Sequence, residues 1–305
     1  MRRNSMKKRM SLVVPAFVIL CMLFVATFAT AQTTKATRLV PKRLSSTGDS
    51  ITEAIDAELP LANHWASWVN GYHGLWEWMF GLTDVYSHNQ RITKNFGSLG
   101  RKNYMEAKSG ADMPDFPAQA AASVSHRAQY VTVFMGHNDV CGNDPIDIPS
   151  DEEFEAYFRA GMEKLRTGLP AGATIYVIGI VDIYQLWQIA QDKKALGIVD
   201  CEVLWATTAL DLFPCGTMLN PLNEEEDRQY TRERNIAFNE ILKMVTQEYN
   251  LKDRKHYYYY TDATFNYHFV ESQVSDIDCF HPSAFGQKDL SKLTWDIGPF
   301  KAYRK

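Results

Sequence analysis

Four short blocks of the sequence contain residue types that can carry out nucleophilic chemistry. They are GDS at 48–50, AKSGA at 107–111, GHND at 136–139 and DCFHP at 278–282. A serine hydroxyl is a weak nucleophile near neutral pH and needs a base to remove its proton. His281 could be that base for Ser50. Asp278, three residues earlier, could then fix the imidazole tautomer and stabilise the imidazolium. The blocks therefore predict a catalytic set of Ser50, His281 and Asp278.

The order and residue types of these blocks resemble those of the SGNH (GDSL-type) esterase and lipase family. The resemblance covers most of residues 43–295. Details such as SWVNG, SHNQRI and DCFHPS are nearest to the branch related to phospholipase B, whereas the glycine block departs most from the family pattern. The resemblance implies an α/β fold, a three-layer α/β/α sandwich with a mainly parallel central sheet (flavodoxin-like), and a serine hydrolase without cofactor or metal.

The resemblance also assigns the donors of an oxyanion hole. They are the backbone N–H groups of Ser50 and Gly110 and the side-chain amide of Asn138. The residue types suit this role, because glycine lets the backbone approach a substrate closely and asparagine offers uncharged donors. The alternative is that Gly110 only forms a turn and Asn138 only caps a loop. Asp49 and Asp139 are expected to brace their turns rather than to act on substrate.

Ser50 has a second possible role, as the N-cap of a helix. Serine is a favoured cap, and Glu53 completes the capping-box pattern. The tripeptide GDS alone favours the cap, and the other three blocks favour the nucleophile. The two roles are compatible, since a helix start also offers a positive dipole end to an oxyanion.

The N-terminus has the pattern of an export signal. Five basic residues precede an apolar run that closes with the small residues ATA at Ala31: Arg2, Arg3, Lys7, Lys8 and Arg9. Residues 1–31 are therefore predicted to be a signal peptide, cleaved near Ala31, and the protein to be secreted or periplasmic. An uncleaved anchor is disfavoured by Pro15 and the small-residue end. Residues 32–42 should form a loosely held arm, and residues 43–305 a single domain.

Charge and motif content exclude several other functions. Without the signal, the 27 remaining basic and 36 acidic side chains give a net charge of −9. Such a chain is not expected to bind nucleic acid, and no second long apolar run predicts stable membrane insertion after cleavage. The sequence lacks the G-x-S-x-G, H-E-x-x-H and P-loop motifs. The acidic stretch NDVCGNDPIDIPSDEE lacks the order of a calcium loop.

Four cysteines follow the signal: Cys141, Cys201, Cys215 and Cys279. An even number in an exported chain predicts disulfides, and their spacing does not fit zinc. Cys141 lies close to Asn138 and Cys279 close to His281. Both catalytic partners must converge on one carbonyl group, so Cys141–Cys279 is the expected pair. Cys201–Cys215 would then be the second.

Apolar runs that alternate with amphipathic runs predict the elements that position these residues. Strands are expected at 130–136, 174–181 and 256–261, and helices at 150–168 and 224–250. In such sheets ligands bind beyond the carboxyl ends of the strands, where Ser50 and the GHND block should lie. The aromatic segment 64–80 is expected mainly to pack, with an aromatic wall for an acyl chain or sugar as the alternative.

Together these features predict an exported serine esterase or lipase that acts through an acyl-enzyme. Its substrate would be a small-molecule or lipid ester, in first place a lipid or phospholipid acyl ester. Two alternatives remain open. One is a carbohydrate acetylesterase, and the other is a catalytically silent binding protein on the same fold.

Overall fold

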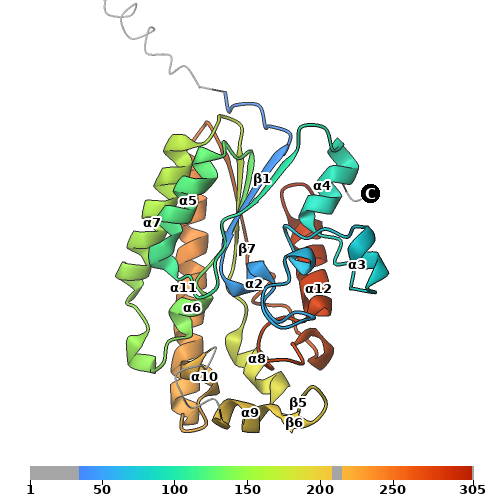
Figure 1. Cartoon of the computed structure of the whole chain (residues 1–305). Coiled ribbons are helices and arrows are strands. Elements are labelled where there is room, and N and C mark those ends of the chain that lie inside the picture. The colour runs from blue at the N-terminus through green and yellow to red at the C-terminus, as the bar shows by residue number, and fades with distance from the viewer. Residues whose placement is uncertain (1–33, 208–214, 304–305) are drawn as a thin grey trace, which may run out of the picture. The chain divides into compact units, whose positions relative to one another are not determined.

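The computed structural model describes residues 34–207 and 215–303. A sheet of five parallel strands lies at its centre, in the order β2–β1–β3–β4–β7 (Figure 1). The strands are β1 (Arg43–Gly48), β2 (Lys102–Met105), β3 (Tyr130–Phe134), β4 (Thr174–Ile178) and β7 (Tyr257–Thr261). The chain starts near the middle of the sheet and adds strands on both sides. The connecting helices therefore cover both faces.

The strands that carry the site are buried on both faces. All residues of β3 and β4 are buried, and so are those of β1 after Arg43. Because helices cover both faces of a parallel sheet, β3 and β4 are nearly continuous apolar runs without alternation. The strands predicted at 130–136, 174–181 and 256–261 are confirmed as β3, β4 and β7, which are slightly shorter.

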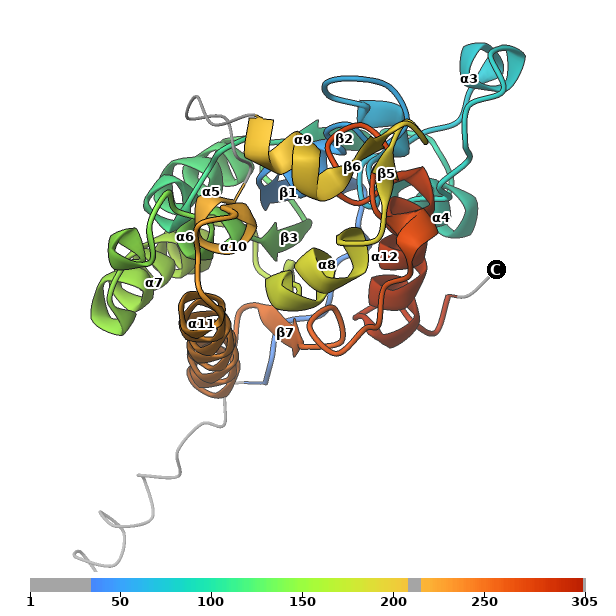
Figure 2. The same ribbon diagram turned by 90° about the horizontal axis from the view of Figure 1, so that it is seen from below.

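The long helices form the two outer layers. On one side lie α5 (Phe116–Ser125), α7 (Asp151–Gly168) and α11 (Glu225–Lys252), and on the other α4 (His88–Phe96) and α12 (Ala284–Ile297) (Figures 1 and 2). The three-layer α/β/α sandwich predicted from the sequence is confirmed. So are the two predicted helices, as α7 and α11, and Ser150 caps α7 by accepting a hydrogen bond from the backbone N–H of Glu153 at 3.2 Å.

Short elements surround the carboxyl ends of the strands. They include α2 (Ser50–Glu53), α6 (His137–Val140), α8 (Ile183–Ala190), α9 (Cys201–Thr207), α10 (Gly216–Leu219) and the hairpin β5 (Lys194–Ala195) and β6 (Val199–Asp200). The helix α3 (Leu75–Met79) projects from the same region, and four 3-10 turns lie at 64–66, 113–115, 145–147 and 271–273. Figure 2 looks at this end and shows the short elements arranged around β1 and β3.

The segment before β1 is held more firmly than predicted. The described residues from Lys35 onward belong to one compact unit. Ala36 donates its backbone N–H to the carbonyl of Arg254 at 2.9 Å, and the guanidinium of Arg38 lies 5.0 Å from the ring centroid of Tyr257. The expectation of a loose arm is wrong for this part, because half-buried tyrosines of β7 provide a surface for basic side chains. The predicted signal peptide lies outside the described residues.

The aromatic segment 64–80 divides into two parts. Trp68 is fully buried and contacts Phe134 edge-on, with 5.5 Å between ring centroids. The side chains of Trp76, Trp78 and Phe80 are instead 66%, 69% and 73% exposed. The prediction that the whole segment mainly packs is therefore wrong for its second half. Composition alone does not distinguish these tryptophans from Trp68.

The four cysteines among the described residues all form disulfides, but not in the predicted pairs. Cys141 is bonded to Cys215 and Cys201 to Cys279, with Cα–Cα distances of 4.2 and 5.8 Å. The convergence argument fails because side chains that meet at a site do not oblige the following residues to meet. The turn after Asn138 instead contacts α10, where Thr217 donates its backbone N–H to the carbonyl of Gly142 at 2.9 Å. Cys279 lies against α9. No helix within the described ranges is long and apolar enough to cross a membrane.

Candidate active site

Ser50 occupies the first position of α2, directly after β1. Asp49 is the N-cap, because its carboxylate accepts the backbone N–H of Ile51 at 3.0 Å. The predicted capping role of Ser50 is therefore wrong, and Glu53 does not complete a capping box. Its carboxylate instead accepts the backbone N–H and the hydroxyl of Ser109, at 2.6 and 2.7 Å. The hydroxyl of Ser50 is free of a capping bond.

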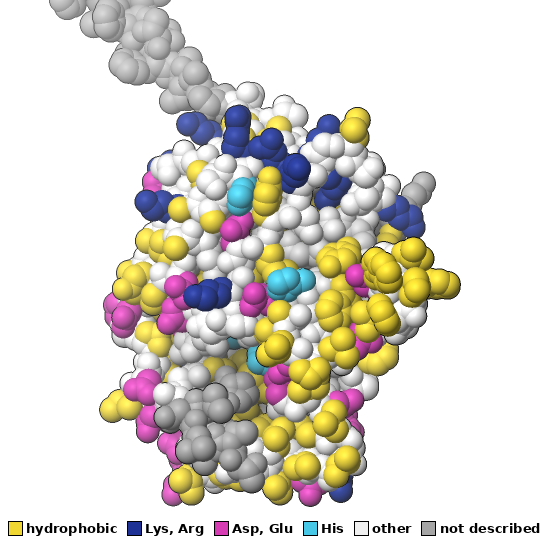
Figure 3. All heavy atoms as spheres, viewed as in Figure 1, with side chains coloured by type: hydrophobic (Ala, Val, Ile, Leu, Met, Phe, Trp, Pro, Cys, Tyr) yellow, Lys and Arg dark blue, Asp and Glu magenta, His cyan; other side chains and the backbone are white. Residues whose placement is uncertain are grey.

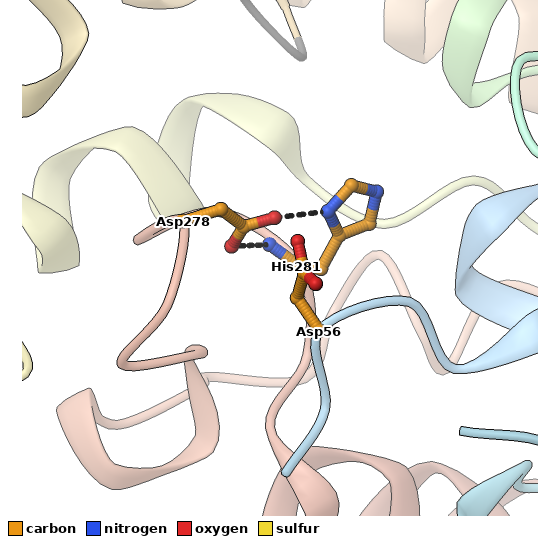
Figure 4. Close-up of side chains that lie close together, drawn as sticks. All are labelled: Asp56, Asp278 and His281. Carbon is orange, nitrogen blue, oxygen red and sulfur yellow. Dashed lines mark hydrogen bonds and ion pairs between the residues drawn. The ribbon is translucent and has the colours of Figure 1, made fainter. Parts of the chain in front are cut away.

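A chain of hydrogen bonds joins Ser50, His281 and Asp278. The hydroxyl oxygen of Ser50 lies 2.7 Å from Nε2 of His281. Nδ1 of His281 donates to Oδ2 of Asp278 (Figure 4). The other carboxylate oxygen of Asp278 accepts the backbone N–H groups of Phe280 and His281, at 2.9 and 3.0 Å. Nδ1 thus carries the proton, and Nε2 has a lone pair directed at the serine.

The backbone between Asp278 and His281 has an unusual conformation that allows this pairing. Cys279 has φ of +60°, in the left-handed region that a non-glycine residue enters at a cost of about 1–2 kcal/mol. The turn lets the Asp278 carboxylate fold back onto the imidazole three residues later. The disulfide to Cys201 anchors the residue that adopts this conformation.

Electrostatics at the pair favour the ionised aspartate and the protonated histidine. Burial opposes ionisation of Asp278, but the charge and hydrogen bond of His281 together lower the pKa of Asp278 below its ordinary value. Burial likewise opposes protonation of His281, while Asp278, and to a smaller extent Asp56, raise the pKa of His281 above 6.5. The side chains of His281 and Asp278 are 12% and 19% exposed, so the pair is shielded but reachable.

Asp56 is a third titratable group beside this pair, and sequence reasoning missed it. Its carboxylate accepts the backbone N–H of Leu61 at 2.6 Å, and burial, together with the nearby Asp278, raises the pKa of Asp56. Asp56, Asp278 and His281 are the described residues whose ligand atoms lie close enough together to share a cation (Figure 4). Both ring nitrogens of His281 already make hydrogen bonds, one with Ser50 and one with Asp278. His281 and Asp278 therefore take part in the hydrogen-bond chain to Ser50.

Gly110 and Asn138 lie together on a second side of the site. Gly110 has φ of +77°, a conformation that favours glycine, and is exposed. The side-chain amide of Asn138 donates one hydrogen to the carbonyl of Ala111 at 2.7 Å, which leaves its second N–H for another acceptor. Lys108 donates its backbone N–H to the carbonyl of Gly48 at 3.2 Å. The loop 107–111, called the glycine loop below, is therefore attached directly to the end of β1.

His137 is a second residue that sequence reasoning missed, although it stands within the GHND block. Its Nδ1 lies 2.7 Å from the carboxylate of Asp49, and its Nε2 accepts the backbone N–H of Val181 at 3.5 Å. The buried imidazole therefore joins the ends of β1, β3 and β4. The sequence contained a signal for this contact, because Asp49 stands next to Ser50 and His137 stands next to Asn138.

Asp139 holds the end of the glycine loop through a hydrogen bond to the backbone. Its two carboxylate oxygens accept the backbone N–H of Met113 at 3.1 and 2.9 Å. Burial raises the pKa of Asp139 to about 7, although the Met113 hydrogen bond opposes this shift. Asp49 and Asp139 therefore have the bracing contacts expected of them.

A serine that is hydrogen-bonded to a His–Asp pair at the carboxyl edge of a parallel sheet is the arrangement of a serine hydrolase. The chain belongs to the family of GDSL-like lipases and acylhydrolases, whose model matches residues 47–293. It is therefore an enzyme of the serine hydrolase class that acts on ester bonds. The family match includes all the predicted site residues.

Several solved structures are similar to this chain at low identity. An α/β hydrolase from the metagenome of Lake Arreo in Spain is 15% identical, with a TM-score of 0.47 and coverage of 83% of this chain and 93% of that one. A family 3 carbohydrate esterase of Clostridium thermocellum is 14% identical (TM-score 0.45; 86% and 96% covered). An extracellular lipase of Streptomyces rimosus is 14% identical (TM-score 0.41; 80% and 94% covered). The search of curated proteins finds no match.

Proposed function

We propose that Ser50 is the nucleophile, His281 the general base and Asp278 the residue that orients the base. The observation that carries this proposal is the 2.7 Å contact between the Ser50 hydroxyl and Nε2 of His281, on a ring already fixed by Asp278. As Ser50 attacks the ester carbonyl, its proton moves to Nε2, which then protonates the departing alcohol. Water, deprotonated by the same nitrogen, cleaves the resulting acyl-enzyme.

The proposed oxyanion hole consists of the backbone N–H groups of Ser50 and Gly110 and the free amide N–H of Asn138. Two contacts support this role. The Asn138 amide is oriented by Ala111, next to Gly110, and the glycine loop is attached to α2 through Glu53 and Ser109. Such donors stabilise a transition state because they are in place before charge develops.

Labelling with a fluorophosphonate tests the nucleophile. The reagent should attach to Ser50 in the wild type, as mapped by peptide mass spectrometry, and should fail to label Ser50→Ala. Esterase activity should fall in the same variant by several powers of ten without loss of the fold. Labelling at another serine, or a Ser50→Ala enzyme with near wild-type kcat, would contradict the assignment. A wild-type protein inert to both reagent and esters would indicate a silent binding protein.

The proposed substrate is a lipid or phospholipid acyl ester, as in relatives of phospholipase B. A cavity of about 560 Å³ beside Asp56 supports this only in part, since Leu196, Ile277 and Phe285 share its lining with charged side chains such as Glu58, Lys193 and Asp276. A series of chromogenic esters from acetyl to dodecanoyl should show increasing kcat/KM with chain length. Activity confined to acetyl esters, with turnover of an acetylated sugar, would favour the carbohydrate acetylesterase.

Export of the protein is also part of this proposal. The basic and apolar pattern of residues 1–31 motivates it, and two disulfides fit an oxidising compartment. The mature chain is expected to begin at Gln32. N-terminal sequencing of the protein recovered outside the cytoplasm tests this, and a chain that retains Met1 would contradict cleavage.

A further inference from the structure

The helix α3 and the residue after it form an exposed apolar tip. We define this tip by its five apolar side chains: Leu75, Trp76, Trp78, Met79 and Phe80. Each of them is at least 57% exposed. Glu77 is the only charged residue between them. A contiguous group of large apolar side chains on a surface marks an interaction site, whereas scattered ones do not.

The tip is held in place, although its side chains face outward. Gly74 donates its backbone N–H to the Glu77 carboxylate at 2.8 Å at the start of α3. Just beyond the tip, Thr83 donates both its backbone N–H and its hydroxyl to Glu58, at 3.0 and 2.9 Å. Trp76 and Phe80 stack with ring centroids 6.4 Å apart. The apolar rings are therefore presented on a supported loop.

Further exposed apolar residues connect the tip to the candidate active site. Glu58, which anchors the tip, belongs to the loop that also carries Asp56 and the exposed Leu61, which is 77% exposed. Phe285 and Leu196 lie on the same side, at the cavity that Asp56, Glu58 and Thr83 also line. Figure 3 shows hydrophobic side chains gathered over α3 and on the surface below it.

The charge distribution indicates what kind of surface would cover the tip. Residues 44–90 contain no lysine or arginine but six acidic residues. Figure 3 shows a group of basic side chains at the top of the molecule, above the hydrophobic group over α3. Lys42 and Lys102 lie at the amino ends of β1 and β2. An anionic partner would therefore be repelled by the acidic side chains of residues 44–90, the segment that carries the tip. Exposed tryptophans beside a carboxylate instead suit quaternary ammonium headgroups.

The size and shape of the tip disfavour a second copy of the chain. A specific dimer buries about 800 Å² on each partner, contributed by roughly 20–30 residues. The tip is a single short helix that projects from the body, as Figure 2 shows. Tryptophan and phenylalanine on a projection of this kind are the side chains that enter the interface region of a lipid layer.

From these observations we infer that the apolar tip docks the enzyme on a zwitterionic lipid surface, with the candidate active site facing that surface. The inference deepens the proposed function, because it names how a lipid ester would be presented to Ser50. Docking itself requires no hydrolysis. The two proposals can therefore fail independently.

Flotation with phosphatidylcholine vesicles tests the inference. The Ser50→Ala background prevents hydrolysis during the measurement. In this background the full-length mature chain should float with the vesicles. The Trp76→Ala, Trp78→Ala, Phe80→Ala triple variant should bind about tenfold or more weakly, since each ring contributes buried apolar area. A control changes two leucines elsewhere that are at least as exposed as the three rings, Leu99→Ala and Leu251→Ala, and should bind as the parent does.

The same triple variant in the active enzyme should keep its kcat/KM on a soluble short-chain ester and lose turnover of vesicle lipid. Unchanged vesicle binding in the triple variant would overturn the inference. So would binding that appears only with anionic lipid, which would indicate the basic end, or a dimer that dissociates in the variant. If vesicles bind through the tip but their lipid is not hydrolysed, the substrate proposal fails and the docking surface stands.

Discussion

The two walls of the candidate active site are built in different ways. The serine wall continues the central sheet: Gly48 exchanges two hydrogen bonds with the Gln119 side chain, at 2.8 and 2.9 Å, and Asp49 is fully buried against His137. The histidine wall is the loop 274–283. It is held by the Cys201–Cys279 disulfide, by an isolated bridge between Val274 and Pro282, and by contacts with the loop that carries Asp56.

Because of this difference, mutations in the two walls should affect folding and activity to different degrees. The serine shares the rigidity of a buried parallel sheet, so changes that move it should also destabilise the fold. The histidine depends on a few contacts between loops. Changes there should lower activity at little cost in folding free energy. The predictions below test this contrast, in order of decreasing expected effect.

Asp278→Asn should have the largest effect of the four. Asparagine keeps the size and the acceptor for the backbone N–H groups of Phe280 and His281, but it no longer stabilises the imidazolium or fixes the proton on Nδ1. We expect kcat to fall about 10⁴-fold, with a melting temperature close to that of the wild type. Steady-state kinetics and thermal unfolding measure the two quantities. A loss of activity matched by unfolding would place Asp278 among structural residues instead.

Asn138→Ala tests the oxyanion donor on the serine wall. Removal of one such donor typically lowers kcat about 100- to 1,000-fold, because the lost bond forms only as charge develops on the carbonyl oxygen. KM should change little. A variant altered mainly in KM would indicate that Asn138 binds the ground state. The Asn138 amide also bonds Ala111, so circular dichroism should verify that the glycine loop remains folded.

The two disulfides provide a matched pair of variants for the contrast between walls. Their sequence separations are 74 and 78 residues, so the chain-entropy effects of losing either are nearly equal. The Cys201→Ser, Cys279→Ser enzyme should lose activity on the order of 10- to 100-fold, since Cys279 stands between Asp278 and His281. The Cys141→Ser, Cys215→Ser enzyme should lose much less, because the turn after Asn138 is also held by Thr217 and Asp139. Equal losses would contradict the contrast.

The serine wall was more predictable from sequence than the histidine wall, for a physical reason. Apolar runs identify β3 and β4, and a turn after a buried strand necessarily lies at the carboxyl edge, so the position of Asn138 at that edge follows from the sequence. Ser50 also lies beyond a strand end, as expected, but its strand β1 is not among the predicted strands. The disulfide partner of Cys279 in the histidine wall could not be predicted in this way. The pairing depends on the path of the long segment between β4 and α11, which carries Cys201 and Cys215. Local sequence carries no signal for that path.

Two smaller failures have the same origin. The capping pattern at Ser50 is real as a sequence pattern, but Asp49 competes for the cap and Glu53 finds a tertiary partner in Ser109. In the aromatic segment, Trp68 and Trp76 are the same residue type eight positions apart and have opposite burial. Burial follows from the path of the loop, and residue type does not determine it.

Asp56→Asn should have the smallest effect, visible only in the pH profile. His281 must be neutral to accept the serine proton, so activity is lost as the pH falls through the pKa of His281, which lies above 6.5. Asp56 contributes to that elevation by its negative charge, although less than Asp278 does. Asparagine retains the acceptor for the Leu61 N–H and removes the charge. The pKa of His281 should therefore decrease, and the acid limb of kcat/KM should move to lower pH, while the plateau at high pH stays near the wild-type value.

The matched control for this variant is Asp262→Asn, the same substitution at an exposed residue of the loop after β7. It removes an equal charge from the protein without a place beside His281, so its acid limb should coincide with that of the wild type. An equal shift in both variants would mean that net charge, and not the position of Asp56, sets the limb. If Asp56→Asn instead lowers the plateau, Asp56 holds the histidine loop in place. Asp56 would then belong with the contacts of the histidine wall, because a contact between its loop and the loop 274–283 would determine the position of His281.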